Sequence, residues 1–220
     1  MEYTDREYCL EVWGDWACFT RPELKVERVS YDVITPSAAR AIFEAIFWKP
    51  AIRWQVTKIE VINPIKWTTI RRNEVGAVAG KTPLFIEEKR QQKNSLLLQD
   101  VRYRIYAKLI YRPARERKGE AIKEGENPMK YYQMFERRAS QGQCFTQPYL
   151  GCREFAANWS LIESTEGFDA PLAEDRDLGI MLYDMDFDGN PKKPDAMFYR
   201  AKMEHGVIVV PDKDSEEVLR

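Results

Sequence analysis

The segment from residue 8 to residue 50 constrains the fold most, because it predicts a strand, a charged loop and a helix in direct succession. Tyr8, Leu10 and Val12 alternate with Glu and Cys residues, which is the two-residue period of a strand with unlike faces. Gly14 is expected to break this pattern and to end the strand.

A capped helix is predicted at the end of this segment. Thr35 is a good N-cap, Pro36 fits the first helical position, and Pro50 is expected to stop the helix. One apolar stripe at helical spacing lies between them: Ala38, Ala39, Ile42, Phe43, Ile46 and Phe47.

The loop between the predicted strand and helix combines basic and aromatic side chains. Arg21, Lys25 and Arg28 accompany Phe19 and Tyr31. Cationic groups contact phosphates and aromatic rings stack on bases, so this loop is suited to nucleic acid. The two rings could equally belong to the core.

The same signals recur along the chain. Alternation predicts strands at residues 52–62 and 101–111, and a second helix is predicted from its N-cap Asn127 to its C-cap Gly142. The order strand, helix, strand, strand, helix, strand is the ferredoxin-like or RRM-like arrangement, so the predicted fold class is α+β. Short strands of a C-terminal antiparallel β-sheet extension are predicted at residues 178–187, 196–203 and 207–210.

The predicted order of strands and helices divides the chain into two domains. Residues 1–150 are predicted to form an RRM-like RNA-binding domain, and residues 151–220 a small β-sheet extension. Within the first, residues 67–98 are less regular and contain Gly76 and Gly80. We predict a long hairpin or insertion there, partly mobile until something binds it.

The clearest strand signal runs from residue 101 to residue 111. Its apolar face alternates with a basic and aromatic one that carries Arg102, Arg104, Tyr106 and Lys108. A sheet-based RNA binder has such a face. A sheet face left in water is the alternative.

Composition sets outer limits on function. The chain has 44% hydrophobic and 31% charged residues, and no run approaches the roughly 18 apolar residues of a membrane span. The charged N-terminus lacks the apolar core of a signal peptide, so a cytoplasmic location is expected, with no membrane partner. The four cysteines show no metal-ligand spacing, and we expect them to be reduced and mostly buried: Cys9, Cys18, Cys144 and Cys152.

Charge is unevenly distributed along the chain, although its net value is only −1. Residues 161–220 hold 7 Lys and Arg against 15 Asp and Glu, so the rest of the chain holds the other 27 basic and 20 acidic residues. A basic body with an acidic C-terminal third favours one polyanion-binding face. Ordinary solvated surface is the alternative.

Three local patterns resemble functional motifs and are rejected. Residues 76–82 have one residue too few between the glycines of a phosphate loop, and Pro83 follows where a helix should begin. Residues 184–189 begin like a calcium loop, but its twelfth position is Asp195 rather than glutamate. His205 is the only histidine, so neither a histidine-based triad nor a multi-histidine metal site is available.

Several motifs together closely resemble CRISPR-associated Cas family five, in its subtype I-C (Dvulg) branch. They preserve their order and cover most of the chain. They lie at residues 19–23, 25–31, 44–50, 71–74, 142–145, 148–155, 177–182, 203–204 and 206–208. The resemblance implies an RRM-like domain followed by a small β-sheet extension.

The resemblance also implies a catalytic site for RNA cleavage. Members that process CRISPR RNA are associated with a tyrosine at the end of the first helix and a Lys-His pair at the start of the second. Here Phe47 stands at the first position and has no hydroxyl, Lys130 matches, and Tyr131 replaces the histidine, with Tyr132 beside it. Lys130 would stabilise the phosphate and either tyrosine could act as acid or base, without metal or cofactor.

The shared motifs further imply an RNA-binding surface. Its candidate cations are Arg21, Lys25, Arg28, Lys49, Arg71, Arg72 and Arg153. The expected function is cleavage of precursor CRISPR RNA in its repeat, followed by retention of the 5′ handle. The implied partners are the precursor and mature guide RNA and the backbone and large subunits of a type I-C surveillance complex. A non-catalytic subunit that caps the RNA handle is the main alternative, and double-stranded DNA binding is a third.

Overall fold

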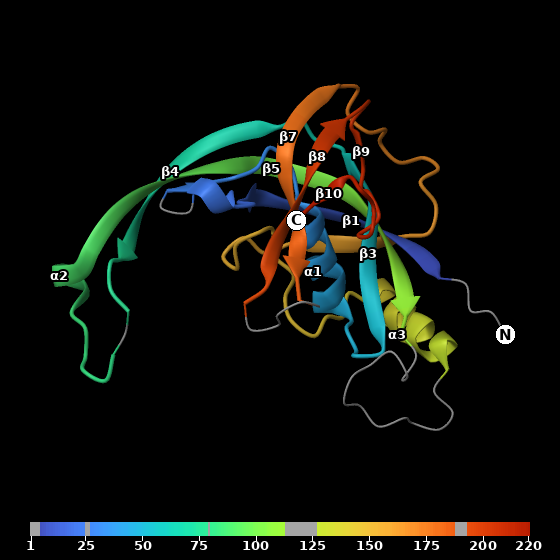
Figure 1. Cartoon of the computed structure of the whole chain (residues 1–220), viewed down its shortest axis with the longest axis horizontal. Helices are drawn as coiled ribbons and strands as arrows, with labels where there is room; N and C mark the ends of the chain where they lie inside the picture. The colour runs from blue at the N-terminus through green and yellow to red at the C-terminus, as the bar shows by residue number, and fades with distance from the viewer. Residues whose placement is uncertain (1–4, 25–26, 79, 113–126, 188–192) are drawn as a thin grey trace.

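Two sheets, antiparallel except where β2 pairs with β5, and two main helices make up the computed structural model (Figure 1). It describes residues 5–24, 27–78, 80–112, 127–187 and 193–220. The larger sheet has the strand order β6-β1-β5-β3-β9, with β2 and β4 also paired to β5. Its strands are β1 (Arg6–Ala17), β2 (Arg28–Val29), β3 (Ile52–Val61), β4 (Lys66–Val75), β5 (Arg90–Tyr111), β6 (Asn158–Ile162) and β9 (Val207–Val209). The smaller sheet has the order β10-β8-β7, from β7 (Arg176–Asp186), β8 (Asp195–Met203) and β10 (Val218–Leu219).

Both long helices begin where the sequence predicts. In α1 (Pro36–Ile46) the Thr35 hydroxyl accepts a hydrogen bond from the Ala38 amide at 3.2 Å. In α3 (Pro128–Ser140) the Asn127 side chain accepts one from the Met129 amide at 2.9 Å. Each cap satisfies an amide that has no partner inside its helix. Two short helical segments, η1 (Pro22–Leu24) and α2 (Ile86–Lys89), complete the elements.

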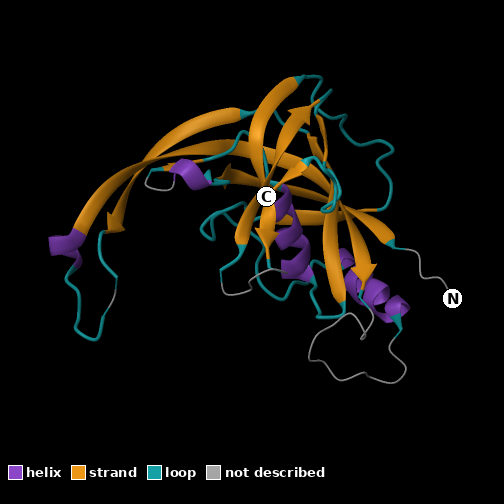
Figure 2. Ribbon diagram, in the orientation of Figure 1, coloured by secondary structure: helices purple, strands orange, loops and turns teal. Residues whose placement is uncertain are grey.

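One face of the larger sheet carries the helices and the main core (Figure 2). Aromatic rings join the layers: Trp54 of β3 stacks on Phe43 of α1 with centroids 4.7 Å apart, and its edge meets Phe135 of α3 at 4.6 Å. The Trp54 indole also donates to the Phe47 carbonyl at 2.9 Å. α1 additionally contacts β7, so the smaller sheet shares this core.

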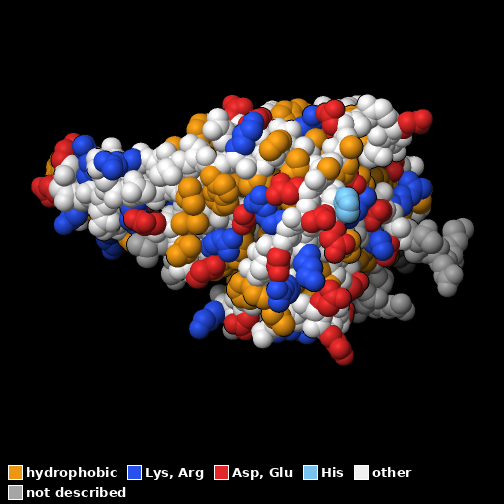
Figure 3. All heavy atoms as spheres, turned by 90° about the horizontal axis from the view of Figure 1, so that it is seen from above, with side chains coloured by type: hydrophobic (Ala, Val, Ile, Leu, Met, Phe, Trp, Pro, Cys, Tyr) orange, Lys and Arg blue, Asp and Glu red, His pale blue; other side chains and the backbone are white. Residues whose placement is uncertain are grey.

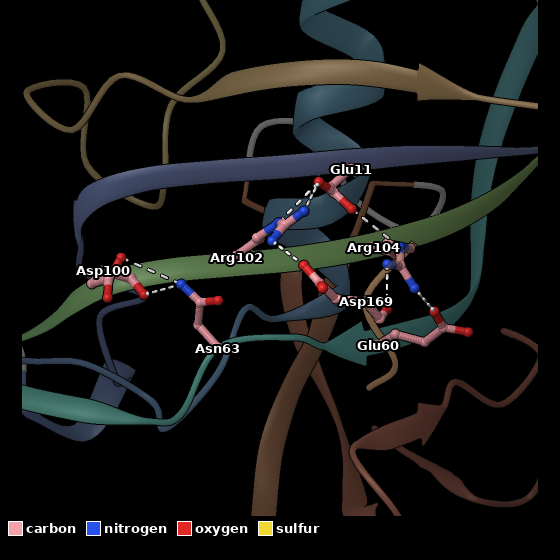
Figure 4. A network of polar contacts seen from close by, with 7 residues as sticks. All are labelled: Glu11, Glu60, Asn63, Asp100, Arg102, Arg104 and Asp169. Carbon is pink, nitrogen blue, oxygen red and sulfur yellow. Dashed lines mark hydrogen bonds and ion pairs between the residues drawn. The ribbon is translucent and has the colours of Figure 1, made fainter. Parts of the chain in front are cut away.

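The opposite face of the larger sheet carries a buried ionic network (Figure 4). Arg104 of β5 is only 2% exposed, and its guanidinium contacts Glu11 of β1 at 3.1 Å and Glu60 of β3 at 3.4 Å. It also donates to the Asp169 carbonyl at 2.5 Å, so the segment between β6 and β7 covers it. Arg102 pairs with Glu11 at 2.8 Å and with the Asp169 carboxylate at 2.7 Å. The prediction of an open basic face is therefore wrong at Arg104, because its guanidinium is buried and paired with the carboxylates of Glu11 and Glu60.

A long two-stranded arm extends from the body (Figure 1). We call the paired segments 66–75 and 90–99 the hairpin arm. The predicted hairpin is confirmed, but β5 begins at Arg90, eleven residues before the strand predicted from alternation. Asp100 interrupts that alternation because its φ is +55° within the strand.

Two further boundaries differ from the prediction. β1 does not end at Gly14 but continues to Ala17, and glycine is needed there because a Cβ would lie 2.7 Å from the Leu150 side chain. β6 and β9 both follow residue 150 and nevertheless belong to the larger sheet.

The predicted strands near 178–187, 196–203 and 207–210 are confirmed within two residues as β7, β8 and β9. A tight turn at His205 joins β8 to β9, since His205 has a φ of +49° and Gly206 one of +74°.

Removal of the buried cation should destabilise the fold strongly. Arg104→Ala leaves Glu11 and Glu60 buried without their partner, so we expect the free energy of unfolding to fall by about 3–5 kcal/mol. Lys66→Ala is the matched control, because its pair with Asp100 is exposed and should contribute less than about 1 kcal/mol. Urea unfolding measures both. Equal losses in the two variants would contradict a central role for Arg104.

Candidate functional site

The N-terminus of α3 presents the first catalytic candidate. Lys130 is the third residue of the helix and is exposed, and its amide donates to the Asn127 carbonyl at 3.1 Å. The first-turn amides of Met129 and Lys130 are already bonded to Asn127 and Pro128 has none, so the helix dipole is what favours an anion at this end. The lysine ammonium adds a full positive charge to the same region.

The two tyrosines that follow Lys130 differ in environment. Tyr132 is 2% exposed, with the Arg6 guanidinium 5.1 Å from its ring centre, and burial raises the pKa of its phenol. Tyr131 is partly exposed, and its ring stacks on Tyr111 with centroids 6.1 Å apart. Of the two, Tyr131 is the one that a bound RNA can reach.

Phe47 lies at the end of α1 and is fully buried. The Arg138 guanidinium lies 5.4 Å from its ring centre and donates to the neighbouring Ile46 carbonyl at 3.2 Å. Arg138 lies eight residues beyond Lys130, roughly 12 Å along the helix axis. Arg138 thus joins α3 to the end of α1, and no local sequence pattern predicts that contact.

Charges from four segments gather where β2 and the loop at residue 154 contact the outer half of the hairpin arm. We call Arg28, Arg72, Lys93, Glu74 and Glu154 the root cluster. Glu74 lies 3.5 Å from Arg28, 3.8 Å from Arg72 and 3.6 Å from Lys93. Glu154 bridges Arg28, at 3.8 Å, and Arg72. The cluster holds three cations and two carboxylates, so one positive charge is in excess.

The other candidate cations surround this cluster or lie apart from it. Arg71 is exposed and its guanidinium lies 3.4 Å from the Asn94 side chain, while Arg153 is exposed on the loop that carries Glu154. Arg21 is largely covered, stacked 4.4 Å from the Tyr31 ring centre and paired with Asp32 at 3.1 Å. Lys49 is exposed beyond the end of α1. Lys25 falls outside the described residues.

The aromatic candidates for base stacking separate clearly by exposure. Phe19 and Tyr31 are 3% and 1% exposed and belong to the core. Trp48 is 52% exposed and lines a cleft of about 500 Å³ between α1, β3 and β7. Arg53 and Arg112 line the same cleft, so an exposed ring and two guanidinium groups face one space.

Charge on the visible surface is mixed rather than concentrated. In Figure 3, Lys and Arg side chains alternate with Asp and Glu side chains along the body. The face seen in this view therefore has no continuous basic patch. Among the described residues, no group of three or more His, Cys, Asp or Glu is arranged to hold a metal ion. No helix in the described ranges is long and apolar enough to cross a membrane.

Comparison with known proteins decides the family. The family model described as CRISPR-associated protein (Cas_Cas5) matches residues 7–211. This chain belongs to the Cas5d family. A curated relative from Mannheimia succiniciproducens, named CRISPR pre-crRNA endoribonuclease Cas5d, is 45% identical over 96% of this chain and 97% of its own length. A relative from Thermus thermophilus with the same name is 40% identical over 96% of this chain and 94% of its own length.

Solved structures support the fold of this Cas5d chain. One, described as the crystal structure of a CRISPR-associated protein, covers all of both chains with a TM-score of 0.73 and 24% identity. A second, of a functionally uncharacterized protein from Streptococcus mutans, covers both chains with a TM-score of 0.72 and 22% identity. The family resemblance inferred from the sequence motifs is thus confirmed.

A tight backbone contact holds the loop that bears Glu154. Gly151 has a φ of +83°, and a Cβ there would collide with the Cys18 carbonyl. Gly151→Ala should therefore lower the free energy of unfolding by about 2–5 kcal/mol, from both backbone strain and the clash. Gly142→Ala is the matched control, because its φ is +64° but nothing lies within 4 Å of its Cβ position. We expect a loss of about 1–2 kcal/mol there by chemical denaturation, and an equal loss in both variants would contradict the contact.

Proposed function

We propose that this protein cleaves precursor CRISPR RNA within its repeat and remains bound to the 5′ handle. The observation that carries this proposal is full-length similarity to two relatives named pre-crRNA endoribonucleases, at 45% and 40% identity. We further propose that it acts as a subunit of a type I-C surveillance complex, beside the backbone and large subunits.

The proposed chemistry uses the ribose 2′-OH as the nucleophile. The 2′ oxygen attacks the adjacent phosphorus, the bond to the 5′ oxygen breaks, and a 2′,3′-cyclic phosphate remains. Lys130, at the helix N-terminus, stabilises the negative charge that develops on the phosphate. Tyr131 donates a proton to the leaving 5′ oxygen, since an ordinary phenol with a pKa near 10 is protonated at neutral pH. Its exposure favours Tyr131 over the buried Tyr132 for this role.

The RNA handle is proposed to follow the hairpin arm and its root. The excess positive charge of the root cluster supports this path, as do the exposed Arg71 and Arg153 nearby. Arg residues already oriented by carboxylates present a fixed fork to phosphates. Lys49 and the exposed Trp48 would contact RNA nearer the proposed catalytic groups.

We also propose the ferredoxin-like reading of the larger sheet. With β1, β3, β5 and β6 counted as strands one to four, the observed order β6-β1-β5-β3 is four, one, three, two. α1 connects the first two of these strands and α3 the last two, as in that arrangement. The division near residue 150 then means that β6 returns to complete the first sheet before the smaller sheet begins.

A second candidate function is a non-catalytic subunit that caps the handle. The observation that favours it is the buried Phe47, which cannot supply the hydroxyl associated with RNA-processing members of the family. The presence of Tyr131 where those members have a histidine also favours the non-catalytic capping function. Product chemistry separates the two candidates.

Cleavage should depend on Lys130 and Tyr131 but not on Tyr132. We expect wild type to cut the repeat RNA of its own locus in excess chelator and to leave a cyclic phosphate. Lys130→Ala should reduce the single-turnover rate at least about 100-fold and Tyr131→Phe about 10–100-fold. Tyr132→Phe keeps the buried ring and serves as the control with a near-normal rate. Tight binding without any cut in wild type would instead establish the capping function.

Binding should depend on exposed cations of the arm. Arg71→Ala is expected to weaken binding to repeat RNA and to reduce the slope of log affinity against log salt by about 1, because one phosphate contact is lost. Arg200→Ala is the control, since Arg200 is an exposed arginine on the smaller sheet, paired with Asp177. Fluorescence anisotropy over a salt series measures both. Unchanged slopes in both variants would contradict the proposed path.

A further inference from the structure

Two cysteines meet beside the root cluster although 134 positions separate them in the sequence. Cys18 follows the end of β1 and is fully buried, whereas Cys152 lies in the loop between Gly151 and Glu154 and is partly exposed. The Cys152 sulfur lies 3.7 Å from the Cys18 carbonyl oxygen, and the two thiols are hydrogen-bonded to each other. The partly exposed Cys152 side chain therefore lies beside the buried Cys18 side chain.

The surroundings of Cys152 favour its thiolate. The hydrogen bond from the Cys18 thiol, together with the positive charge of Arg28, lowers the pKa of Cys152 to about 6. The Arg28 Nη1 atom lies 3.7 Å from its sulfur. The same hydrogen bond and burial raise the pKa of Cys18, which keeps its proton. A thiolate at neutral pH is the form that attacks peroxides and disulfides.

The backbone brings the two sulfurs within reach of a covalent bond. The Cys18 amide donates to the Leu150 carbonyl at 3.0 Å, and Gly151 packs directly on the Cys18 carbonyl. The Cys152 sulfur already lies 3.7 Å from the Cys18 carbonyl oxygen, so we expect side-chain rotation to bring the two sulfurs toward the S–S length of about 2.05 Å.

We infer that Cys18 and Cys152 form a thiol–disulfide site that takes hydrogen peroxide as its oxidant. This inference is independent of the proposed function. The Cys152 thiolate attacks one peroxide oxygen, the O–O bond breaks, and the leaving hydroxide takes up a proton to become water. Cys152 is then a sulfenic acid. The Cys18 sulfur attacks the Cys152 sulfur, the S–O bond breaks, and a second water leaves with the Cys18 proton. The two thiols lose two electrons in total, and the peroxide is reduced to two waters.

Oxidation would change the charge at the root cluster. The thiolate is one of three anionic groups around Arg28, beside Glu74 and Glu154. The disulfide removes this negative charge and ties the end of β1 to the loop that bears Glu154. Disulfides of this kind are reversible in a reducing compartment, so a thiol reductant should restore the pair.

The test counts thiols in the full-length protein. Reduced protein is treated with hydrogen peroxide, unfolded, alkylated with iodoacetamide and digested for mass spectrometry. We expect two of the four cysteines to escape alkylation, an intact mass smaller by two hydrogen atoms, a peptide pair joined through Cys18 and Cys152, and reversal by dithiothreitol. In reduced protein at pH 7, Cys152 should be alkylated about tenfold faster than the partly exposed Cys144.

Variants separate this chemistry from general oxidation. Cys18→Ser should leave Cys152 as a sulfenic acid that dimedone traps, and Cys144→Ser should leave disulfide formation unchanged. In wild type, loss of the Cys144 thiol as fast as that of Cys152, or oxidation of Cys152 with Cys18 still alkylatable, would overturn the inference. The wild-type result decides the matter even if a variant fails to fold.

Discussion

The guanidinium of Arg104 fixes the register of the three central strands of the larger sheet, β1, β5 and β3. Arg104 of β5 lies directly opposite Glu11 in the pairing with β1 and directly opposite Glu60 in the pairing with β3 (Figure 4). A shift of either neighbour by one residue would turn its carboxylate to the apolar core and leave the arginine buried without a partner. The Asp169 carbonyl adds a fourth segment to the same group. Side-chain electrostatics and strand register thus depend on each other here.

The same network decides which surface is open for binding. A four-stranded sheet that binds RNA on its face needs exposed side chains on its central strands. Here Arg104 is enclosed, Arg102 is paired with two carboxylates, and the Lys58 ammonium lies 3.8 Å from the Tyr106 ring centre. This face is therefore closed at Arg104 and its remaining cations are only partly exposed, apart from Lys108, which is exposed. The other exposed and partly exposed candidate cations lie in and around the root cluster and near the ends of α1 and α3.

The parts of the fold that follow from the sequence are those governed by local physics. The N-caps Thr35 and Asn127 act on amides two or three residues away, so both helix starts are predictable. β5 depends instead on pairing with β4, and the positive φ of Asp100 separates its two stretches of alternation. The continuation of β1 through Gly14 depends on its pairing with β5, in which Gly14 lies opposite Val101 and Ala17 opposite Leu98. β6 has only five residues, too short an alternation to be distinguished from a loop, and pairing with β1 defines it.

The candidate sites, too, combine features that the local sequence predicts with features that only distant packing determines. Residue types near Lys130 are visible in the sequence, but only packing separates the reachable Tyr131 from the buried Tyr132. The root cluster joins positions from residue 28 to residue 154, so its composition cannot be read from spacing. Its two carboxylates compete with any phosphate for the three cations, and this lowers the affinity that each cation can supply. They also hold the guanidinium groups in place before binding, which reduces the ordering that RNA must impose. With a single charge in excess, such a surface selects a polyanion of matching shape over one that offers charge alone.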